Sequence, residues 1–334
     1  MDLHLHTGRS LKKPLLLSFA VSAVLVALAI ALEVKGASLL AQIATFVATV
    51  PLLTLLFAMG SEKVSHYLTE QFQQPAAARK VTALMALCLA ITGVGSGFDP
   101  YFWLLMAGMF AALLLGMREL QQSSFGWLDM LAWLAILIPF DYRLTSAEWF
   151  GVDNFAYAWW AAAVSVLTLL IWRQTRQLPG FNMRLKLRRQ DLVVWVLTTV
   201  GAVVVLIPLG LWLGFIEWRA ELSLNPLDLV ATFLGLFTSV AIPEELLFRG
   251  VLMMAILQVT GSSLQAVLFS SLAFGIFHWN RVDTLDAQLS YTLLASIAGV
   301  AYALAYRKTD NNLLAPVLTH TSVDWIWKVF FITR

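Results

Sequence analysis

The sequence predicts an all-α fold, a polytopic bundle of transmembrane helices with about eleven spans. Its 334 residues are 60% hydrophobic and only 13% charged, whereas soluble globular domains carry about 25% charged residues. Uncharged runs of about twenty residues recur along the chain, which is the length that a helix needs to cross a bilayer. These observations exclude a soluble enzyme, a disordered chain and a fibre.

The expected spans follow the uncharged runs in order. The first runs from Pro14 to Leu32, after the basic residues Arg9, Lys12 and Lys13. It is longer than the apolar core of a cleaved signal peptide, about 7–15 residues, so we interpret it as a retained helix. The run at 127–140 is short enough to be a re-entrant segment. The other spans are expected near 37–60, 81–98, 101–117, 155–172, 192–216, 227–247, 264–279, 287–306 and 313–332.

Lysine and arginine residues in short loops predict the orientation, because cytoplasmic loops are enriched in them. Those on the N-terminal side are Lys63, Arg79, Lys80, Arg118, Arg307 and Lys308, with further basic residues between Arg173 and Arg189. The opposite loops carry mainly acidic residues: Asp99, Asp141, Glu148, Asp153, Glu217 and Glu221. The N-terminus is therefore expected to be cytoplasmic.

The basic stretch from Arg173 to Arg189 is also the best candidate for a domain boundary. It contains Pro179 and Gly180 and separates an N-terminal bundle, residues 1–185, from a C-terminal domain, residues 186–334. Its simplest interpretation is a loop whose charges follow the positive-inside rule, and binding of anionic lipid is the alternative. The single cysteine, Cys88, excludes an intrachain disulfide and a cysteine-based metal site.

Several catalytic and nucleotide-binding motifs are absent from the sequence. There is no HExxH helix of a zinc peptidase, no GxSxG elbow and no GxGD motif of an aspartyl intramembrane protease. The phosphate-binding GxxxxGK[ST] loop and the GxGxxG dinucleotide turn are also missing. Nucleotide-driven, flavin-dependent and NAD-dependent functions therefore lose their support, and no cofactor is expected.

Charged residues interrupt the hydrophobic stretch from about 227 to 257, where lipid disfavours them. A charged residue at the centre of a membrane helix costs about 2.5–3.5 kcal/mol on insertion scales. These residues are therefore expected to face the interior of the protein and to have a function there. Glu245 and Arg249 are spaced for an ion pair on one helix face. That pairing leaves Glu244 without a local partner, just after Pro243, and a buried carboxylate of this kind is a candidate general base.

Two further polar pairs occur in apolar runs, Phe274 with His278 and His320 with Asp324. Glu244 precedes the turn at Gly261 by as many residues as His278 follows it, so a hairpin would bring both to one depth, about 25 Å from the turn. His320 is expected about 15 Å into the membrane, a level that helix tilt can reconcile with the other two. Taken singly, each pair has a structural interpretation in helix packing. Their order and spacing indicate one polar site, with a polar cavity between the helices that bear these motifs, through which water reaches the site.

These three motifs, Glu-Glu-x-x-x-Arg, Phe-x-x-x-His and His-x-x-x-Asp, resemble those of the CPBP family of CAAX-protease and bacteriocin-processing membrane proteins, over about residues 190–332. The resemblance implies a glutamate-dependent, metal-independent intramembrane endopeptidase that cuts a membrane-associated peptide or protein. It implies Glu244 as general base, His278 as the residue that positions water, and His320 with Asp324 on the side of the oxyanion. It assigns supporting roles to Glu245, Arg249 and Phe274. Many relatives have Asn at the position of Asp324, so Asp324 is expected to orient His320.

Three other functions remain open on the residues alone. The chain can be a non-catalytic membrane binding or immunity-type protein. Glu244, His278 and Asp324 can form the proton relay of a transporter. Glu244, His278 and His320 can supply a zinc site. In each case we expect a multi-pass protein of a bacterial cytoplasmic membrane, in contact with the lipid bilayer and without a nucleic-acid partner.

Overall fold

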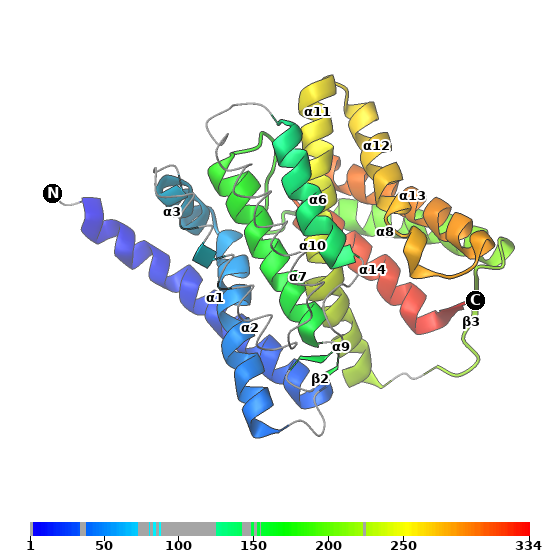
Figure 1. Cartoon of the computed structure of the whole chain (residues 1–334), viewed down its shortest axis with the longest axis horizontal. Coiled ribbons are helices and arrows are strands. Elements are labelled where there is room, and N and C mark those ends of the chain that lie inside the picture. The colour runs from blue at the N-terminus through cyan, green and yellow to red at the C-terminus, as the bar shows by residue number, and fades with distance from the viewer. Residues whose placement is uncertain are drawn as a thin grey trace. The chain divides into compact units, whose positions relative to one another are not determined.

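The computed structural model describes residues 3–33, 38–72, 80, 83–84, 87, 125–141, 148–149, 152–153, 155–222 and 225–334 (Figure 1). The chain forms two compact units, Met1–Gln177 and Leu178–Arg334. The expected spans near 81–98 and 101–117 lie largely outside the described residues, as does Cys88. The functional division at residue 185 stays a prediction.

The described residues of the first unit form helices and one short strand pair. Its helices are α1 (Leu3–Glu33), α2 (Leu39–Met59), α3 (Glu62–Phe72), α6 (Trp127–Asp141) and α7 (Phe155–Thr168), which continues into the π-helical segment η1 (Leu169–Thr175). Strands β1 (Glu148–Trp149) and β2 (Val152–Asp153) pair in antiparallel register. Helix α2 packs against both α1 and α7. The N-terminal span predicted from Pro14 to Leu32 therefore lies within one continuous helix.

Two arginines of the predicted basic loop are part of this unit's helix packing. Arg176 forms a two-point ion pair with Asp129, with Nη2–Oδ2 at 2.5 Å and Nε–Oδ1 at 2.9 Å. Arg173 donates to the carbonyl oxygen of Met59 at 2.7 Å. Arg173 lies in η1. Both residues thus hold helices together. The interpretation of the stretch as a loop whose charges follow the positive-inside rule did not predict this role.

The second unit carries the three motifs. Its elements begin with α8 (Arg189–Trp212) and β3 (Ile216–Trp218). One continuous helical stretch follows, made of α9 (Pro226–Leu236), η2 (Phe237–Ala241), α10 (Ile242–Glu245), η3 (Leu246–Met253) and α11 (Met254–Thr260). The remaining elements are α12 (Ser263–Ile276), η4 (Trp279–Arg281), α13 (Leu285–Lys308), α14 (Leu314–Phe330) and β4 (Phe331–Thr333), which pairs antiparallel with β3.

Local sequence signals set the ends of these helices. Asn225, followed by Pro226, caps α9 by accepting from the Leu227 amide at 3.0 Å. Gly261 ends α11 with a φ of 65°, a left-handed conformation that glycine adopts at low cost. Ser262 then caps α12. The hairpin predicted around Gly261 is therefore confirmed.

Small residues let α12 and α13 pack closely. A Cβ atom added at Gly275 would collide with Ser296 Oγ and with the backbone oxygen of Thr292. A Cβ at Gly299 would lie 3.0 Å from Cα of Ser271 on the other helix. Small residues at such crossings are typical of membrane helices, because close backbone approach replaces the hydrophobic driving force. This contact holds the end of α12, where His278 follows, against α13.

The substitution Gly275→Ala is expected to destabilise the protein by about 1–3 kcal/mol, because the added methyl group has no space and the two helices must move apart. Thermal unfolding in detergent measures the change. Gly201→Ala is the matched control, since a Cβ at this mid-helix position of α8 meets no atom within 4 Å. An unfolding midpoint for Gly275→Ala as high as that of the control would contradict this account of the packing.

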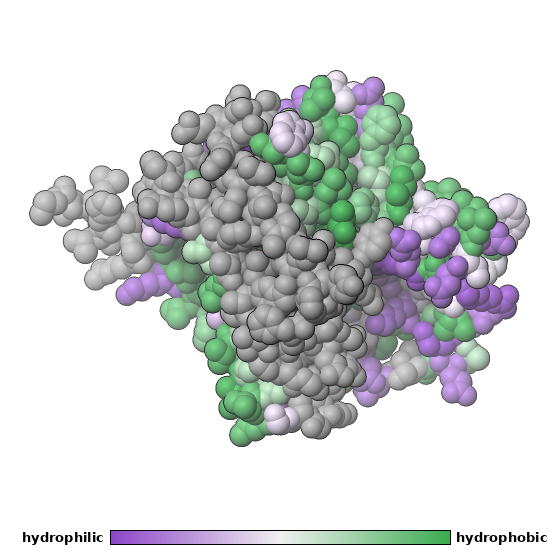
Figure 2. Space-filling view, in the orientation of Figure 1, coloured by the Kyte–Doolittle hydropathy of each residue, from purple (hydrophilic) through white to green (hydrophobic). Residues whose placement is uncertain are grey.

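Within the described residues, four helices are long and apolar enough to cross a membrane: Leu11–Ala31, Leu39–Met59, Arg189–Trp212 and Leu285–Lys308. The run Trp127–Ile138 is a shorter apolar helix. Figure 2 shows hydrophobic side chains over the outer surfaces of α11 and α12, and Leu268, Phe269 and Leu272 are among those exposed. The chain is a mostly helical membrane protein, as predicted. The count of eleven spans and the cytoplasmic N-terminus stay predictions.

Candidate active site

The first motif lies in the middle of the helical stretch from 226 to 260. Glu244 and Glu245 end α10, between the π-helical segments η2 and η3, and Arg249 lies in η3. All three residues are buried, with exposed fractions of 2% or less for the whole residue. Interruptions of this kind in an α-helix are frequent at functional sites, because they redirect side chains.

The buried side chain of Arg249 contacts Glu245 on its own helical stretch and residues of α12 and α13. Its Nη1 donates to Glu245 Oε1 at 3.1 Å, which confirms the ion pair predicted from the spacing. Its Nη2 donates to the carbonyl oxygen of Gly299 on α13 at 2.9 Å. The guanidinium carbon lies 4.5 Å from the ring centre of Phe274 and 5.3 Å from that of Tyr302. Arg249 therefore joins the first motif to α12 and α13.

His320 lies among three carboxylates. Its Nδ1 is 2.8 Å from Glu245 Oε1, and its Nε2 is 3.3 Å from Asp324 Oδ2 and 3.8 Å from Glu244 Oε2. The ring stacks on Tyr302 with the centres 4.5 Å apart. Since an ionised carboxylate only accepts hydrogen bonds, this pattern is satisfied by an imidazolium with protons on both nitrogens.

The side chains next to His320 hold its helix in place. Thr319 shares a 2.9 Å hydrogen bond with Thr198 of α8, and Ser322 accepts from the Trp195 indole of α8 at 3.1 Å. On another face of α14, Trp325 donates to the carbonyl oxygen of Leu229 in α9 at 2.9 Å. The second unit therefore fixes α14 from two sides, so that His320 and Asp324 project toward the first motif.

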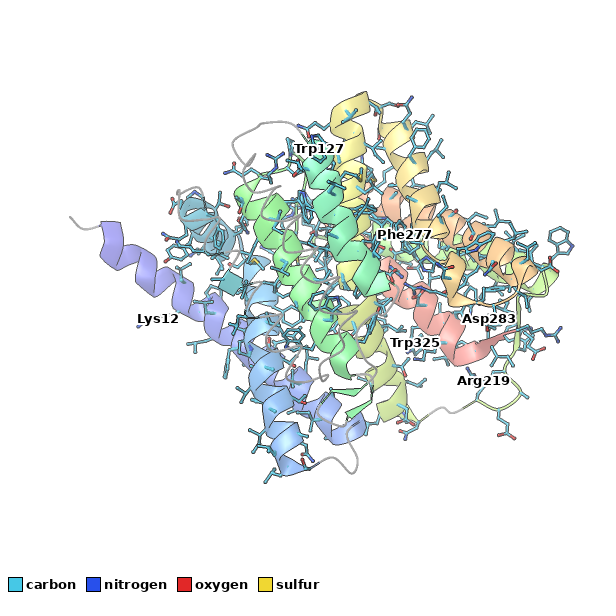
Figure 3. The ribbon with its side chains drawn as sticks, in the orientation of Figure 1. Lys12, Trp127, Arg219, Phe277, Asp283 and Trp325 are labelled. Atoms are coloured by element: carbon cyan, nitrogen blue, oxygen red, sulfur yellow. The ribbon has the colours of Figure 1, made fainter. Side chains whose placement is uncertain are left out.

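His278 lies just beyond the end of α12, where Figure 3 shows the neighbouring Phe277. Its Nδ1 is 2.7 Å from the carbonyl oxygen of Phe274. A carbonyl can only accept, so Nδ1 carries a proton and Nε2 of the neutral ring is left as the acceptor. The ring also lies against Phe274 and Tyr291, with centres 4.6 Å and 5.1 Å apart.

Phe274 is the common wall between the two histidines. Its ring centre lies 5.6 Å from that of His320, so it contacts both imidazoles as well as Arg249. The family resemblance assigns Phe274 a supporting role. Only 2% of the residue is exposed, as expected for a residue that packs in the interior. The three motifs thus meet in one buried cluster.

Three residues that the sequence reading missed complete the cluster. Arg281 donates from Nη2 to Glu244 Oε1 at 3.0 Å, so Glu244 has a partner, one that comes from 37 residues further along the chain. Tyr302 stacks on His320, and Tyr291 contacts His278. The tyrosines are eleven residues apart on α13, a spacing that puts them on one helix face. Arg281 follows His278 by three residues at the end of an apolar run. This position is the one feature of the sequence that indicates a role for Arg281.

A cavity of about 360 Å³ adjoins this cluster. Its polar wall includes His278, Arg281, His320 and Asp324. Its apolar lining is aliphatic and aromatic: Leu206, Leu236, Leu294, Ala295, Ala298 and Val323, with Phe274, Tyr291, Tyr302, Trp327 and Phe331. Glu244, 2% exposed, lies behind the polar wall in contact with Arg281 and His320. The predicted cavity is therefore present, and its lining is partly polar and partly apolar.

The cluster also bears on the possibility of a metal site. In the part of the chain that the structure describes, no group of three or more His, Cys, Asp and Glu side chains is arranged to hold a metal ion. The set considered for zinc, Glu244, His278 and His320, is not assembled in that way. Nδ1 of His278 and Nδ1 of His320 each have a hydrogen-bond partner within the protein.

Comparison with known families matches residues 226–326 to the model described as Type II CAAX prenyl endopeptidase Rce1-like. All residues of the three motifs fall inside the matched segment. The match is consistent with the CPBP family and confirms the resemblance that the motifs carry. No curated protein and no solved structure matches the chain.

Proposed function

We propose that the C-terminal domain, residues 186–334, is a glutamate-dependent intramembrane endopeptidase that hydrolyses a peptide bond in a membrane-associated protein or peptide without a metal ion. The observation that carries the proposal is the buried cluster in which His320 lies between Glu245 and Asp324, 3.8 Å from Glu244, at the wall of a cavity. The family match over residues 226–326 supports the same class of reaction.

Glu244 acts as the general base. A water molecule beside Glu244 Oε2 and His320 Nε2 can bridge the 3.8 Å between them. As the water oxygen attacks the carbonyl carbon of the scissile bond, its proton passes to the carboxylate. The carboxylic acid then returns the proton to the nitrogen of the leaving amine, so one group serves as base and acid in turn. The products are a new carboxylate and an amine.

His278 positions the attacking water. The hydrogen bond from Nδ1 to the Phe274 carbonyl fixes the ring, and it makes Nε2 an acceptor for a proton of that water. His278 lines the cavity, so a water molecule bound there is next to the space that the peptide occupies. Holding the nucleophile in this way lowers the barrier, because the entropy of alignment is lost before the reaction begins.

His320 stabilises the negative charge that develops on the carbonyl oxygen. Glu245 holds the Nδ1 proton of the imidazolium, and the Nε2 proton, 3.3 Å from Asp324, can turn to the oxyanion; in a dry site such a donor contributes several kcal/mol. Asp324, with its side chain 33% exposed, orients His320 from the cavity side. The ring of Tyr302 stacks on the face of the His320 imidazole and restricts its orientation.

The substrate enters from the cavity, whose apolar wall suits nonpolar side chains next to the scissile bond. Such a wall buries nonpolar surface, which is the main favourable term in small binding sites. A membrane-anchored peptide delivers a segment of this kind at the bilayer. The expected location is a bacterial cytoplasmic membrane.

A cleavage assay on the purified full-length protein in detergent tests this function. The probes are synthetic peptides, each anchored by one transmembrane helix, and mass spectrometry identifies every product. Cleavage at one bond, releasing a new carboxyl and a new amino end, is the expected result. Tight binding of one of these peptides without cleavage, or proton uptake by proteoliposomes that depends on Glu244, would instead support the binding protein or the transporter.

Within that assay, the substitution His278→Ala is expected to lower kcat by about 10²-fold or more, because the water loses its acceptor and its position. His66→Ala is the control, since His66 lies on α3 with a side chain 77% exposed. Initial rates at saturating peptide measure both variants. Wild-type kcat for His278→Ala in a folded protein would remove His278 from the mechanism.

A further inference from the structure

Arg281 connects the motif of His278 to Glu244 from a very short element. It ends the three-residue turn η4, and its amide donates to the carbonyl oxygen of His278 at 3.2 Å. The guanidinium reaches Glu244 Oε1 at 3.0 Å. The side chain of Arg281 is 20% exposed and that of Glu244 is 3% exposed, so Arg281 lies between the carboxylate and the cavity.

From this geometry we infer that Arg281 is the positioning residue of Glu244. Its guanidinium holds Oε1, which directs Oε2 toward His320 Nε2, where the attacking water binds. Because His278 directly precedes η4, whose last residue is Arg281, the same turn sets the distance between the water-binding histidine and the base. This role rests on the proposed function and adds a residue outside the three motifs to its machinery.

The contacts of Arg281 favour positioning over a purely structural ion pair. Glu245 already has Arg249 and His320 as partners deep in the cluster, and those contacts do not involve Arg281. The Arg281 contact is made instead on the cavity side and to the one carboxylate that the mechanism uses as a base. A guanidinium suits this task, because its N–H groups point in fixed directions from a rigid plane, whereas the ammonium group of lysine rotates freely.

The test is a double-variant cycle on the full chain with the peptide that the cleavage assay identifies. It compares wild type with R281Q, E244Q and the double variant, and it adds R281K. R188Q is the matched control, because Arg188 pairs with Asp191 and Asp310 and does not line the cavity. Both kcat and KM are measured, together with the thermal unfolding midpoint of each variant in detergent.

R281Q is expected to lower kcat by about 10²-fold with KM changed less than about twofold, because the base is displaced while substrate binding is unchanged. R281K should recover part of the loss. In the E244Q background, R281Q should have no further effect on kcat, since residues that act as a unit are not additive. The unfolding midpoint should fall in R281Q, where a buried carboxylate loses its cation, and should recover in the double variant.

Three results would overturn this role: a wild-type kcat in R281Q, a rise in KM alone, or an unfolding cycle without coupling between the two residues. The unfolding cycle needs no substrate, so it decides whether the pair exists even before a peptide is found. Failure of the proposed function is distinguishable. Activity that survives E244Q contradicts the proposed function and this role together, whereas an inactive E244Q with a fully active R281Q contradicts the role of Arg281 alone.

Discussion

Replacing Glu244 with glutamine is expected to lower kcat for peptide cleavage by about 10²–10⁴-fold, the usual contribution of a general base. Glutamine has nearly the same shape, and its oxygen can still accept from Arg281, so the fold is retained. The amide cannot take a proton from water at neutral pH, so the attacking hydroxide is not generated. Initial rates of cleavage by the purified variant measure the loss.

The control for this variant is Glu221→Gln, at an exposed position outside the cluster. It should cleave at the wild-type rate. The unfolding midpoint of Glu244→Gln should lie near that of wild type, which separates loss of chemistry from loss of fold. Glu244→Gln that cleaves as fast as Glu221→Gln would show that another group activates the water.

The second large effect concerns stability. Replacing Arg249 with methionine is expected to destabilise the protein by about 3–5 kcal/mol, because it breaks a buried ion pair and leaves the His320 imidazolium as the one remaining cation among the described contacts of Glu245. Both side chains are 0% exposed, so water cannot replace the lost partner. The free energy of unfolding, from denaturant titration in detergent, measures the change.

A second variant separates loss of charge balance from loss of packing. The double variant Glu245→Gln with Arg249→Met should recover most of that stability, since both charges of the pair are removed together and the glutamine oxygen can still accept from His320 Nδ1. Arg334→Met is the control, because the side chains of Arg334 and its partner Glu217 are 64% and 36% exposed and surface ion pairs contribute about 0–1 kcal/mol. A double variant as unstable as Arg249→Met alone would contradict this account of the pair.

The sequence alone was sufficient for the helical membrane class and for the partners within each motif. Regular helix periodicity explains this success: Glu245 and Arg249 are four residues apart and do form an ion pair. The turn at Gly261 was predictable because glycine favours the left-handed conformation observed there. The contacts of α12 and α13 that hold the motifs together were not predictable, because they depend on which helix faces meet.

Contacts between distant residues account for what the sequence reading missed. Residue counting puts His320 about 15 Å into the membrane and Glu244 about 25 Å from its turn. In the structure, His320 nevertheless lies 2.8 Å from Glu245. Residue counting treats helices as straight and upright, whereas the stretch from 226 to 260 contains two π-helical segments. The role of Arg281 was not predictable, because its partner Glu244 is 37 residues away and no local sequence pattern links the two residues.

The most direct test of the central claim is the cleavage rate of metal-depleted wild type beside metal-depleted Glu244→Gln, on one membrane-anchored peptide. The account predicts that the wild type keeps its full rate after chelation and that the variant does not cleave. Loss of the wild-type rate on metal removal, with recovery when zinc is added back, would contradict it. So would equal cleavage by the two proteins.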